Sequence, residues 1–167
     1  MNRRTLLSAN PFAWGIRDLD LDLDSLKSGV LRFNRIDAVF ANGDFFTAPD
    51  IDQLPPPLAL DAAVDEEGVT EFFLALHHLN PHGGNCAEDV SDSGQARYLI
   101  VPRDRADLYT EAAEADIATL SQISHLKSGN ENRDQFLTLP VVRIRRTSSN
   151  GFEVESSVVP TSIPLLA

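Results

Sequence analysis

Residues 18–24 alternate strictly between acidic and apolar side chains, and this alternation is the clearest pattern in the chain. A period of two is typical of a β-strand that buries one face and exposes the other. An acidic face of this kind belongs to an antiparallel sheet and meets either water or a basic partner. The pattern therefore predicts one strand with an apolar face and an acidic face, made of Leu19, Leu21 and Leu23 against Asp18, Asp20, Asp22 and Asp24.

Further strands are expected along the chain, with turn signals between them. Asn42-Gly43 is the strongest hairpin signal, and a type I′ turn there needs a positive φ at both residues. Asn150-Gly151 predicts a second hairpin in the same way. A slip in the alternation at Asn34-Arg35 indicates a β-bulge. The expected strands cover residues 30–40, 69–79, 96–102, 136–146 and 152–159, of which 69–79 is the most apolar and is predicted to be central.

Three other segments have a different character. Residues 54–58 read Leu-Pro-Pro-Pro-Leu and predict a stiff extended connector, with a ligand for a proline-binding module as the alternative. Residues 80–94 are rich in Gly, Asn, Asp and Ser and predict an exposed loop. Residues 103–126 are ambiguous, because 108–120 has the composition of a helix whereas Ile117, Leu120 and Ile123 fit a strand equally well.

The count of seven to nine short strands, with no alternation of strands and helices, predicts an all-β fold. A β-sandwich is expected, and a barrel-like arrangement of the same strands is the alternative. The chain has 167 residues, which suits a single domain over residues 1–167. A domain of this length buries enough surface to fold without a metal or a disulfide.

Charge and composition restrict the classes of partner. With 25 acidic and 14 basic residues the net charge is −11, which disfavours nucleic acid and anionic lipid and favours basic protein surfaces. The single cysteine, Cys86, forms no internal disulfide and fits a reducing compartment. The apolar run after Arg4 ends at Ser8, too early for a signal peptide, and no window reaches the ~20 apolar residues of a membrane span. We therefore expect a soluble cytoplasmic domain.

Candidate chemistry is sparse. His77, His78, His82 and Cys86 include possible zinc ligands, but adjacent strand residues such as His77 and His78 face opposite sides and no CxxC or HxxxH pair supports a site. The aspartate series lacks the glycine and the terminal glutamate of a calcium loop. We find no nucleophile elbow, no Cys–His arrangement and no phosphate loop. The sequence therefore predicts no enzyme, no metal and no cofactor.

Several motifs occur in the order known from one protein family. Residues 10–16 read Asn-Pro-Phe-Ala-Trp-Gly-Ile and are followed by Leu19 and the acidic strand. Further matching segments lie at residues 25–31, 40–46, 48–49, 54–58, 139–144 and 159–166. Together they resemble TssK, the family of baseplate subunits of the bacterial type VI secretion system, whose signature is Pro-aromatic-Ala-Trp-Gly.

The resemblance implies a fold, a role and a set of partners. It implies a β-sandwich like the shoulder domain of phage receptor-binding proteins, and a fragment without the family's extreme N-terminal segment, helical middle domain and C-terminal head. It implies a cytoplasmic, homotrimeric adaptor whose shoulder engages the wedge proteins TssF and TssG. The head, absent from this sequence, would face the membrane complex of TssJ, TssL and TssM.

The resemblance does not identify interface residues, so these are predicted from charge and exposure. Exposed loops and charged strand faces are what a sandwich offers to a partner. The alternative function is a carbohydrate- or receptor-binding sandwich of a phage-tail-like assembly, for which Trp14, Tyr98 and Tyr109 are the candidate aromatic residues. The predicted partner-binding residues are Asp18, Asp20 and Asp22 on the acidic strand and His82, Gly83, Gly84 and Asn85 in the loop.

Overall fold

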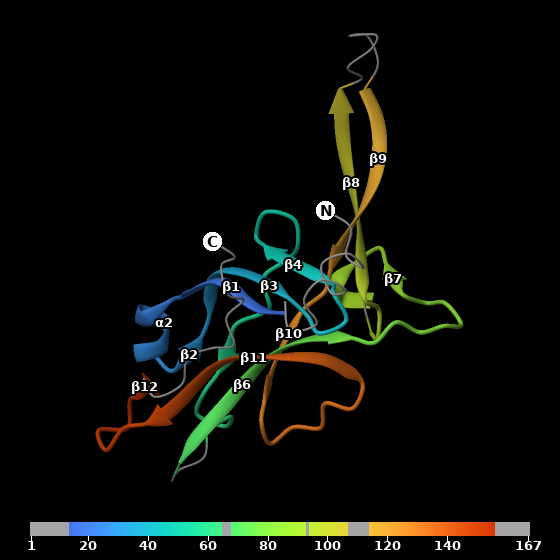
Figure 1. Cartoon of the computed structure of the whole chain (residues 1–167). Coiled ribbons are helices and arrows are strands. Elements are labelled where there is room, and N and C mark those ends of the chain that lie inside the picture. The colour runs from blue at the N-terminus through green and yellow to red at the C-terminus, as the bar shows by residue number, and fades with distance from the viewer. Residues whose placement is uncertain (1–13, 65–67, 93, 107–113, 156–167) are drawn as a thin grey trace, which may run out of the picture.

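A computed structural model describes residues 14–64, 68–92, 94–106 and 114–155 (Figure 1). Within these ranges the chain forms twelve strands, one α-helix, α2 (Leu23–Lys27), and one 3-10 turn, η1 (Val90–Asp92). The strands are β1 (Gly15–Leu21), β2 (Val30–Leu31), β3 (Phe33–Val39), β4 (Phe45–Ala48), β5 (Leu58–Ala59), β6 (Val69–His77), β7 (Cys86–Ala87), β8 (Tyr98–Ala106), β9 (Glu114–Gln122), β10 (His125–Ser128), β11 (Phe136–Arg146) and β12 (Phe152–Val154). Three of them, β2, β5 and β7, have only two residues each, and the other nine agree with the predicted number.

Two antiparallel sheets pack face to face and enclose the main core (Figure 1). One sheet has the strand order β1-β3-β4 and the other β10-β6-β11-β12. The short pair β2-β5 flanks them. This arrangement confirms the predicted β-sandwich, because both sheets contribute fully buried side chains to one cluster: Ile36, Ala38, Phe46, Phe72, Leu74, Leu76, Leu139 and Ile144.

The first sheet follows the alternation seen in the sequence. On β1 the side chains of Asp18 and Asp20 are exposed, whereas Leu19 and Leu21 pack against the core. The register between β1 and β3 shifts where Leu21 faces Phe33, so that Asn34 is the extra residue. The predicted β-bulge at Asn34-Arg35 is therefore confirmed.

The predicted strand over residues 18–24 is too long. Strand β1 ends at Leu21, and Asp22 is the N-cap of α2, where its carboxylate accepts hydrogen bonds from the backbone N–H groups of Asp24 and Ser25 at 3.1 and 3.0 Å. These bonds satisfy helix donors that would otherwise lack partners, so the chain turns into a helix here. Leu23 consequently lies on the surface, 58% exposed, and residues 25–29 are part helix and part turn.

Both predicted hairpins form, but each turn has one residue with a positive φ where a type I′ turn needs two. The N–H of Gly43 donates to the carbonyl of Phe40 at 2.8 Å, and only Gly43 has a positive φ, of 85°. The connection is thus a three-residue loop with glycine in the left-handed region, and the expected type I′ geometry at Asn42 is wrong. At the second hairpin, which joins β11 to β12, the N–H of Asn150 donates to the carbonyl of Thr147 at 3.0 Å. Asn150 has a positive φ, of 64°, whereas Gly151 does not, so this connection is a three-residue loop as well.

The connector and the central strand lie as predicted. Residues 53–57 have no regular structure and carry the chain from the first sheet to β5. Strand β6 lies between β10 and β11, and it is buried along most of its length. Pro140 lies inside β11 opposite Phe73, next to a register shift at Val141, so the strand continues through the proline.

Strands β8 and β9 form an antiparallel arm that projects from the sandwich (Figure 1). At its base the two-residue strand β7 pairs with β8 in parallel, and beyond that point the arm has two strands. Their register runs from Tyr98 opposite Gln122 to Ala106 opposite Glu114. This pairing resolves the ambiguity of residues 103–126 in favour of strand from Glu114 onward. Residues 108–113 of the helix-like stretch lie outside the described residues.

Candidate interaction surface

A buried arginine joins the arm to the sandwich. Arg97 comes directly before β8 and is 1% exposed. Its guanidinium donates to the carbonyl oxygen of His77 at 2.6 Å, to the Asp44 carboxylate at 2.7 Å and to the Gln122 side-chain oxygen at 3.2 Å. The carboxylate also accepts a hydrogen bond from Asn42 at 2.8 Å. One cation therefore fixes the ends of β6 and β9 and the first hairpin relative to one another.

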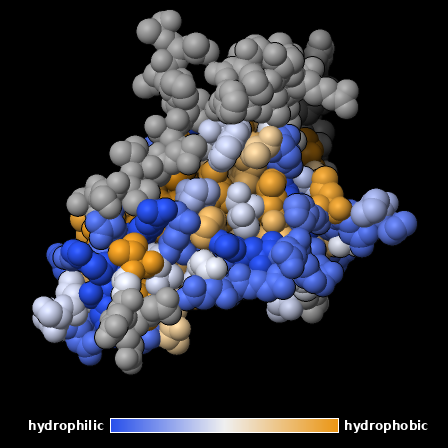
Figure 2. All heavy atoms as spheres, turned by 60° about the horizontal axis from the view of Figure 1, so that its bottom comes forward, coloured by the Kyte–Doolittle hydropathy of each residue, from blue (hydrophilic) through white to orange (hydrophobic). Residues whose placement is uncertain are grey.

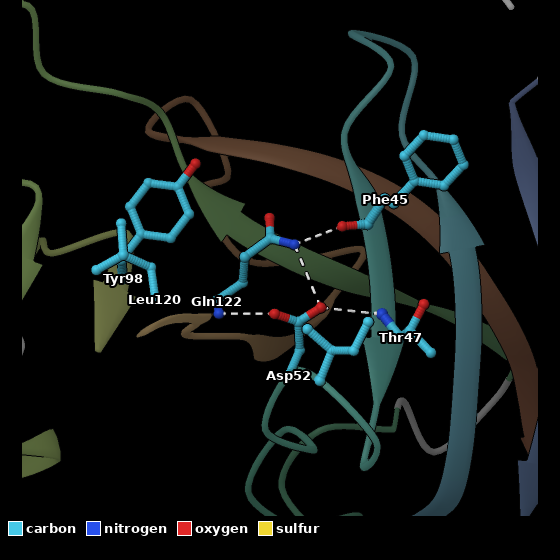
Figure 3. Close-up of a pocket in the computed structure, with 7 residues that line it drawn as sticks. Phe45, Thr47, Asp52, Tyr98, Leu120 and Gln122 are labelled. Atoms are coloured by element: carbon cyan, nitrogen blue, oxygen red, sulfur yellow. Dashed lines mark hydrogen bonds between the residues drawn. The ribbon is translucent and has the colours of Figure 1, made fainter. Parts of the chain in front are cut away.

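A second set of hydrogen bonds lies beside the first, centred on Asp52. Its carboxylate accepts from the backbone N–H of Gln122 at 2.8 Å and from that of Thr47 at 2.9 Å (Figure 3). The Gln122 side-chain amide donates to the carbonyl of Phe45 at 2.5 Å. Asp52 is 5% exposed, and these backbone N–H groups satisfy both oxygens of its buried carboxylate.

A hollow of about 390 Å³ lies above these bonds, between the arm and the first sheet. Figure 3 shows Tyr98 and Leu120 on the arm side and Phe45 and Thr47 on the sheet side, with Asp52 and Gln122 between them. Ile51 completes the lining and is 60% exposed. The hollow combines apolar walls with a polar floor whose groups are hydrogen-bonded, which suits an apolar side chain of a partner.

Two histidines pack against each other near the same junction. The ring centres of His77 and His125 lie 5.3 Å apart. Both rings also lie next to the ring of Phe136, with centre-to-centre distances of 4.2 Å for His77 and 5.7 Å for His125. Burial lowers the pKa of both histidines below the usual 6.5, and the charge of Lys127 lowers each pKa further. Arg97 and His78 act in the same direction on the pKa of His77. Both rings are therefore neutral in the folded protein near pH 7.

This pair should make stability fall in mild acid. The pKa values of both histidines are lower in the folded protein than the 6.5 expected in the unfolded chain. At a pH between the folded and the unfolded pKa, the unfolded chain therefore binds more protons than the folded protein. The neutral histidines contribute fully to stability above about pH 6.5, and this contribution is lost as the pH falls through their folded pKa values. Urea unfolding followed from about pH 7.5 to pH 5 measures this slope. His125→Gln should flatten it, whereas His82→Gln, in an exposed loop, should not. An unchanged slope in His125→Gln would contradict the assignment.

The predicted acidic residues divide between two environments. Asp18 and Asp20 lie exposed on β1, and Arg35 of β3 approaches Asp18 at 3.9 Å. Asp22 instead caps α2, and its hydrogen bonds with Ser25 hold the pKa of its carboxyl below the usual 3.8. Arg32 adds a favourable charge next to Asp22. Arg35 and Arg32 thus each bring a positive charge close to one of these aspartates.

The predicted loop residues lie elsewhere. His82, Gly83 and Gly84 are exposed and Asn85 is half-buried, in the segment that leads to β7. The side chain of Asn85 bonds with the backbone of Asn80 in both directions, at 2.7 and 2.9 Å, which closes the loop on itself. In Figure 1 this segment and α2 lie at opposite sides of the molecule. The seven predicted residues thus do not form one patch, and their role in binding stays a prediction.

The other candidates are placed as follows. His77 is buried and His78 exposed, as the strand alternation predicted, and Cys86 is exposed. Among the described residues, no three His, Cys, Asp or Glu side chains are grouped to hold a metal ion, and no helix is long and apolar enough to cross a membrane. Trp14 is half-buried against the core and Tyr98 lines the hollow, while Tyr109 lies outside the described residues.

Sequence reasoning missed Arg97, which joins the arm to the sandwich, and four residues that line the hollow: Ile51, Asp52, Leu120 and Gln122. One signal was available, since an arginine inside the apolar segment 96–102 requires a buried partner or an exposed position. The identity of that partner was not readable, because Asp44 precedes Arg97 by 53 residues.

Comparison with known proteins identifies the family. The model of the family described as bacterial type VI secretion, VC_A0110, EvfL, ImpJ, VasE matches residues 1–167. The chain belongs to this family, which confirms the resemblance to TssK. A search of the curated proteins found no match.

Solved structures with the same fold carry the name TssK. A chain of the type VI secretion TssK-TssF-TssG baseplate subcomplex matches with a TM-score of 0.82 and 22% identity, over 94% of this chain and 52% of that one. A crystal structure of TssK matches with a TM-score of 0.80 and 22% identity, over 95% of this chain and 36% of that one. The structure of TssK from EAEC in complex with a nanobody matches with a TM-score of 0.69 and 21% identity, over 89% of this chain and 46% of that one. This chain therefore spans about half, or less, of the length of these relatives.

Proposed function

We propose that this chain is the shoulder domain of a type VI secretion baseplate adaptor and that it docks onto a wedge of TssF and TssG. The observation that carries the proposal is the family model, which matches the whole chain. It is supported by a relative of the same fold that was solved in a TssK-TssF-TssG baseplate subcomplex. The role is structural: the domain binds and orients partners in the cytoplasm and carries out no reaction.

The proposal extends to the parts of the relatives that this chain does not match. In that view residues 1–167 form one shoulder domain, which corresponds to 52% and 36% of the lengths of two TssK structures. The helical middle domain and the head that the resemblance implies belong to the remaining length of such proteins. The complete subunit is a homotrimer whose head links the baseplate to the membrane complex of TssJ, TssL and TssM. The shoulder alone accounts for the wedge contact.

Binding to the wedge should depend on salt and on the acidic strand. We expect the immobilised chain to bind a purified TssF–TssG complex saturably and more weakly as the salt concentration rises, because the net charge of −11 attracts a basic partner. Neutralising the exposed pair with Asp18→Asn and Asp20→Asn should weaken binding by about two- to fivefold and reduce the salt dependence. Surface plasmon resonance at low and high salt measures both effects.

A control with the same change in charge lies on the second sheet. Glu71→Gln with Glu153→Gln removes two carboxylates that are paired with Arg143 and Arg145. This variant should bind like the wild type. If the folded wild-type chain shows no saturable binding at either salt concentration, the proposed docking role is wrong.

A further inference from the structure

The arm leaves apolar side chains uncovered. A two-stranded ribbon is at best marginally stable in water unless another layer covers one face. Leu120 is 51% exposed and Ile117 is 45% exposed, both on β9. Strand β9 is also an edge of its sheet, because within the described residues it pairs only with β8. The arm therefore presents apolar surface that a partner could cover.

The hollow at the base of the arm continues into the outer face of the first sheet. Thr47 lines the hollow, and its hydroxyl approaches the Asp37 carboxylate at 3.4 Å. The register places Thr47 opposite Asp37 and Asp37 opposite Asp18, so the three residues form one row across β4, β3 and β1. Cross-strand neighbours in a sheet share a face. An apolar hollow and an acidic sheet face thus form one continuous surface.

This outer face carries more acidic than basic groups. Its carboxylates are Asp18, Asp20, Asp37 and Asp50, all on β1, β3 or the segment after β4. The cations within 4 Å of any of them among the described residues are Arg35, at 3.9 Å from Asp18 and 3.2 Å from Asp50, and Arg17, at 3.7 Å from Asp37. Four carboxylates against two guanidinium groups leave the face net negative.

The outer face of the second sheet has a different balance of charge. Its charges are matched in pairs, with Arg143 bonded to Glu71 at 2.9 Å and Arg145 bonded to Glu153. Figure 2, which brings the lower side of the molecule forward, shows mainly hydrophilic residues on the front, with apolar residues between them. Within the described residues, the surface made by the hollow and the first sheet thus combines apolar groups with an excess of carboxylates, which the paired charges of Arg143 and Arg145 do not show.

We infer that the hollow and the acidic outer face of β1, β3 and β4 form one docking surface for a partner segment that carries an apolar side chain next to lysine or arginine. This inference rests on the proposed function and assigns its contact to specific residues. The apolar side chain enters between Tyr98, Leu120 and Ile51, and the basic residues lie over Asp37 and Asp18. A second copy that presents the same surface is the poorer occupant, because its carboxylates would lie opposite those of the first copy.

The experiment compares two double variants of the 167-residue chain with a purified TssF–TssG complex as the probe. Ile51→Ser with Leu120→Ser removes both exposed walls of the hollow and should weaken binding about tenfold or more. Val69→Ser with Val154→Ser is the control, since these side chains are 45% and 39% exposed on the second sheet. It should change binding less than about twofold. Circular dichroism and thermal unfolding confirm that each variant folds.

The outcomes separate the two proposals. If the wild type binds and both variants bind equally well, the docking surface is overturned while the wedge role stands. If the wild type does not bind, the wedge role is overturned and the surface assignment falls with it. Analytical sedimentation of each variant tests whether a second copy of the chain occupies the surface instead. If Ile51→Ser with Leu120→Ser abolishes self-association and leaves binding to the wedge unchanged, the surface binds a second copy and the inference is overturned.

Discussion

Replacing Arg97 by alanine should lower the free energy of unfolding by about 3–5 kcal/mol, because removing one partner of a buried ion pair leaves the other charge uncompensated. Arg97 is 1% exposed and its partner Asp44 is 9% exposed, so water does not replace the lost bonds. The carbonyl of His77 and the side chain of Gln122 lose a donor as well. Urea unfolding at pH 7 measures the change.

Two comparisons make this result specific. Arg145→Ala removes an exposed pair with Glu153 and should cost much less. The double variant Asp44→Ala with Arg97→Ala should be more stable than the sum of the single changes predicts, because it removes both unpaired charges together. If Arg97→Ala costs no more than Arg145→Ala, the arm is not held by this ion pair.

Local patterns predicted the strands well where the structure-forming interactions are themselves local. The alternation of Asp18 and Leu19 gave the exposed and buried faces of β1, and Gly43 and Asn150 marked both hairpins. A glycine or asparagine at a left-handed position reports on its own backbone, so a single sequence contains the information. The same holds for the prolines of residues 54–58, which cannot supply ladder donors.

Competing local interactions were harder to rank. The alternation continues to Asp24, but the carboxylate of Asp22 bonds to the next backbone N–H groups and starts a helix instead. Side chains of this type offer the backbone an alternative to the sheet ladder, and a pattern of apolar and polar positions does not reveal which one forms. In β9 the alanine- and glutamate-rich composition favoured a helix, but pairing with β8 decides the structure.

The hollow depends on contacts between distant parts of the chain. Asp52 meets Gln122 across 70 residues and Asp44 meets Arg97 across 53. Neither pair has a local signature, so sequence reasoning proposed exposed charges such as Asp18 and missed the residues that join the arm to the sandwich. The resemblance to TssK identified the family from motif order, and it contained no information about which side chains meet at this junction.

Replacing Phe72 by alanine should be similarly costly, at about 3–5 kcal/mol, because it opens a cavity between the two sheets. Phe72 is fully buried on β6 and belongs to the main core. Its neighbour Phe73 is half-buried on the opposite face, where the Arg133 guanidinium lies 3.9 Å from the ring centre. Phe73→Ala is therefore a control of the same chemistry on the same strand, and it should cost less than half as much.

The comparison also tests which face of β6 closes the sandwich. Phe72→Leu should give an intermediate loss, because leucine fills part of the space that alanine leaves empty. Chemical unfolding of the three variants under one set of conditions ranks them directly. Equal losses for Phe72→Ala and Phe73→Ala would mean that both faces of β6 are covered.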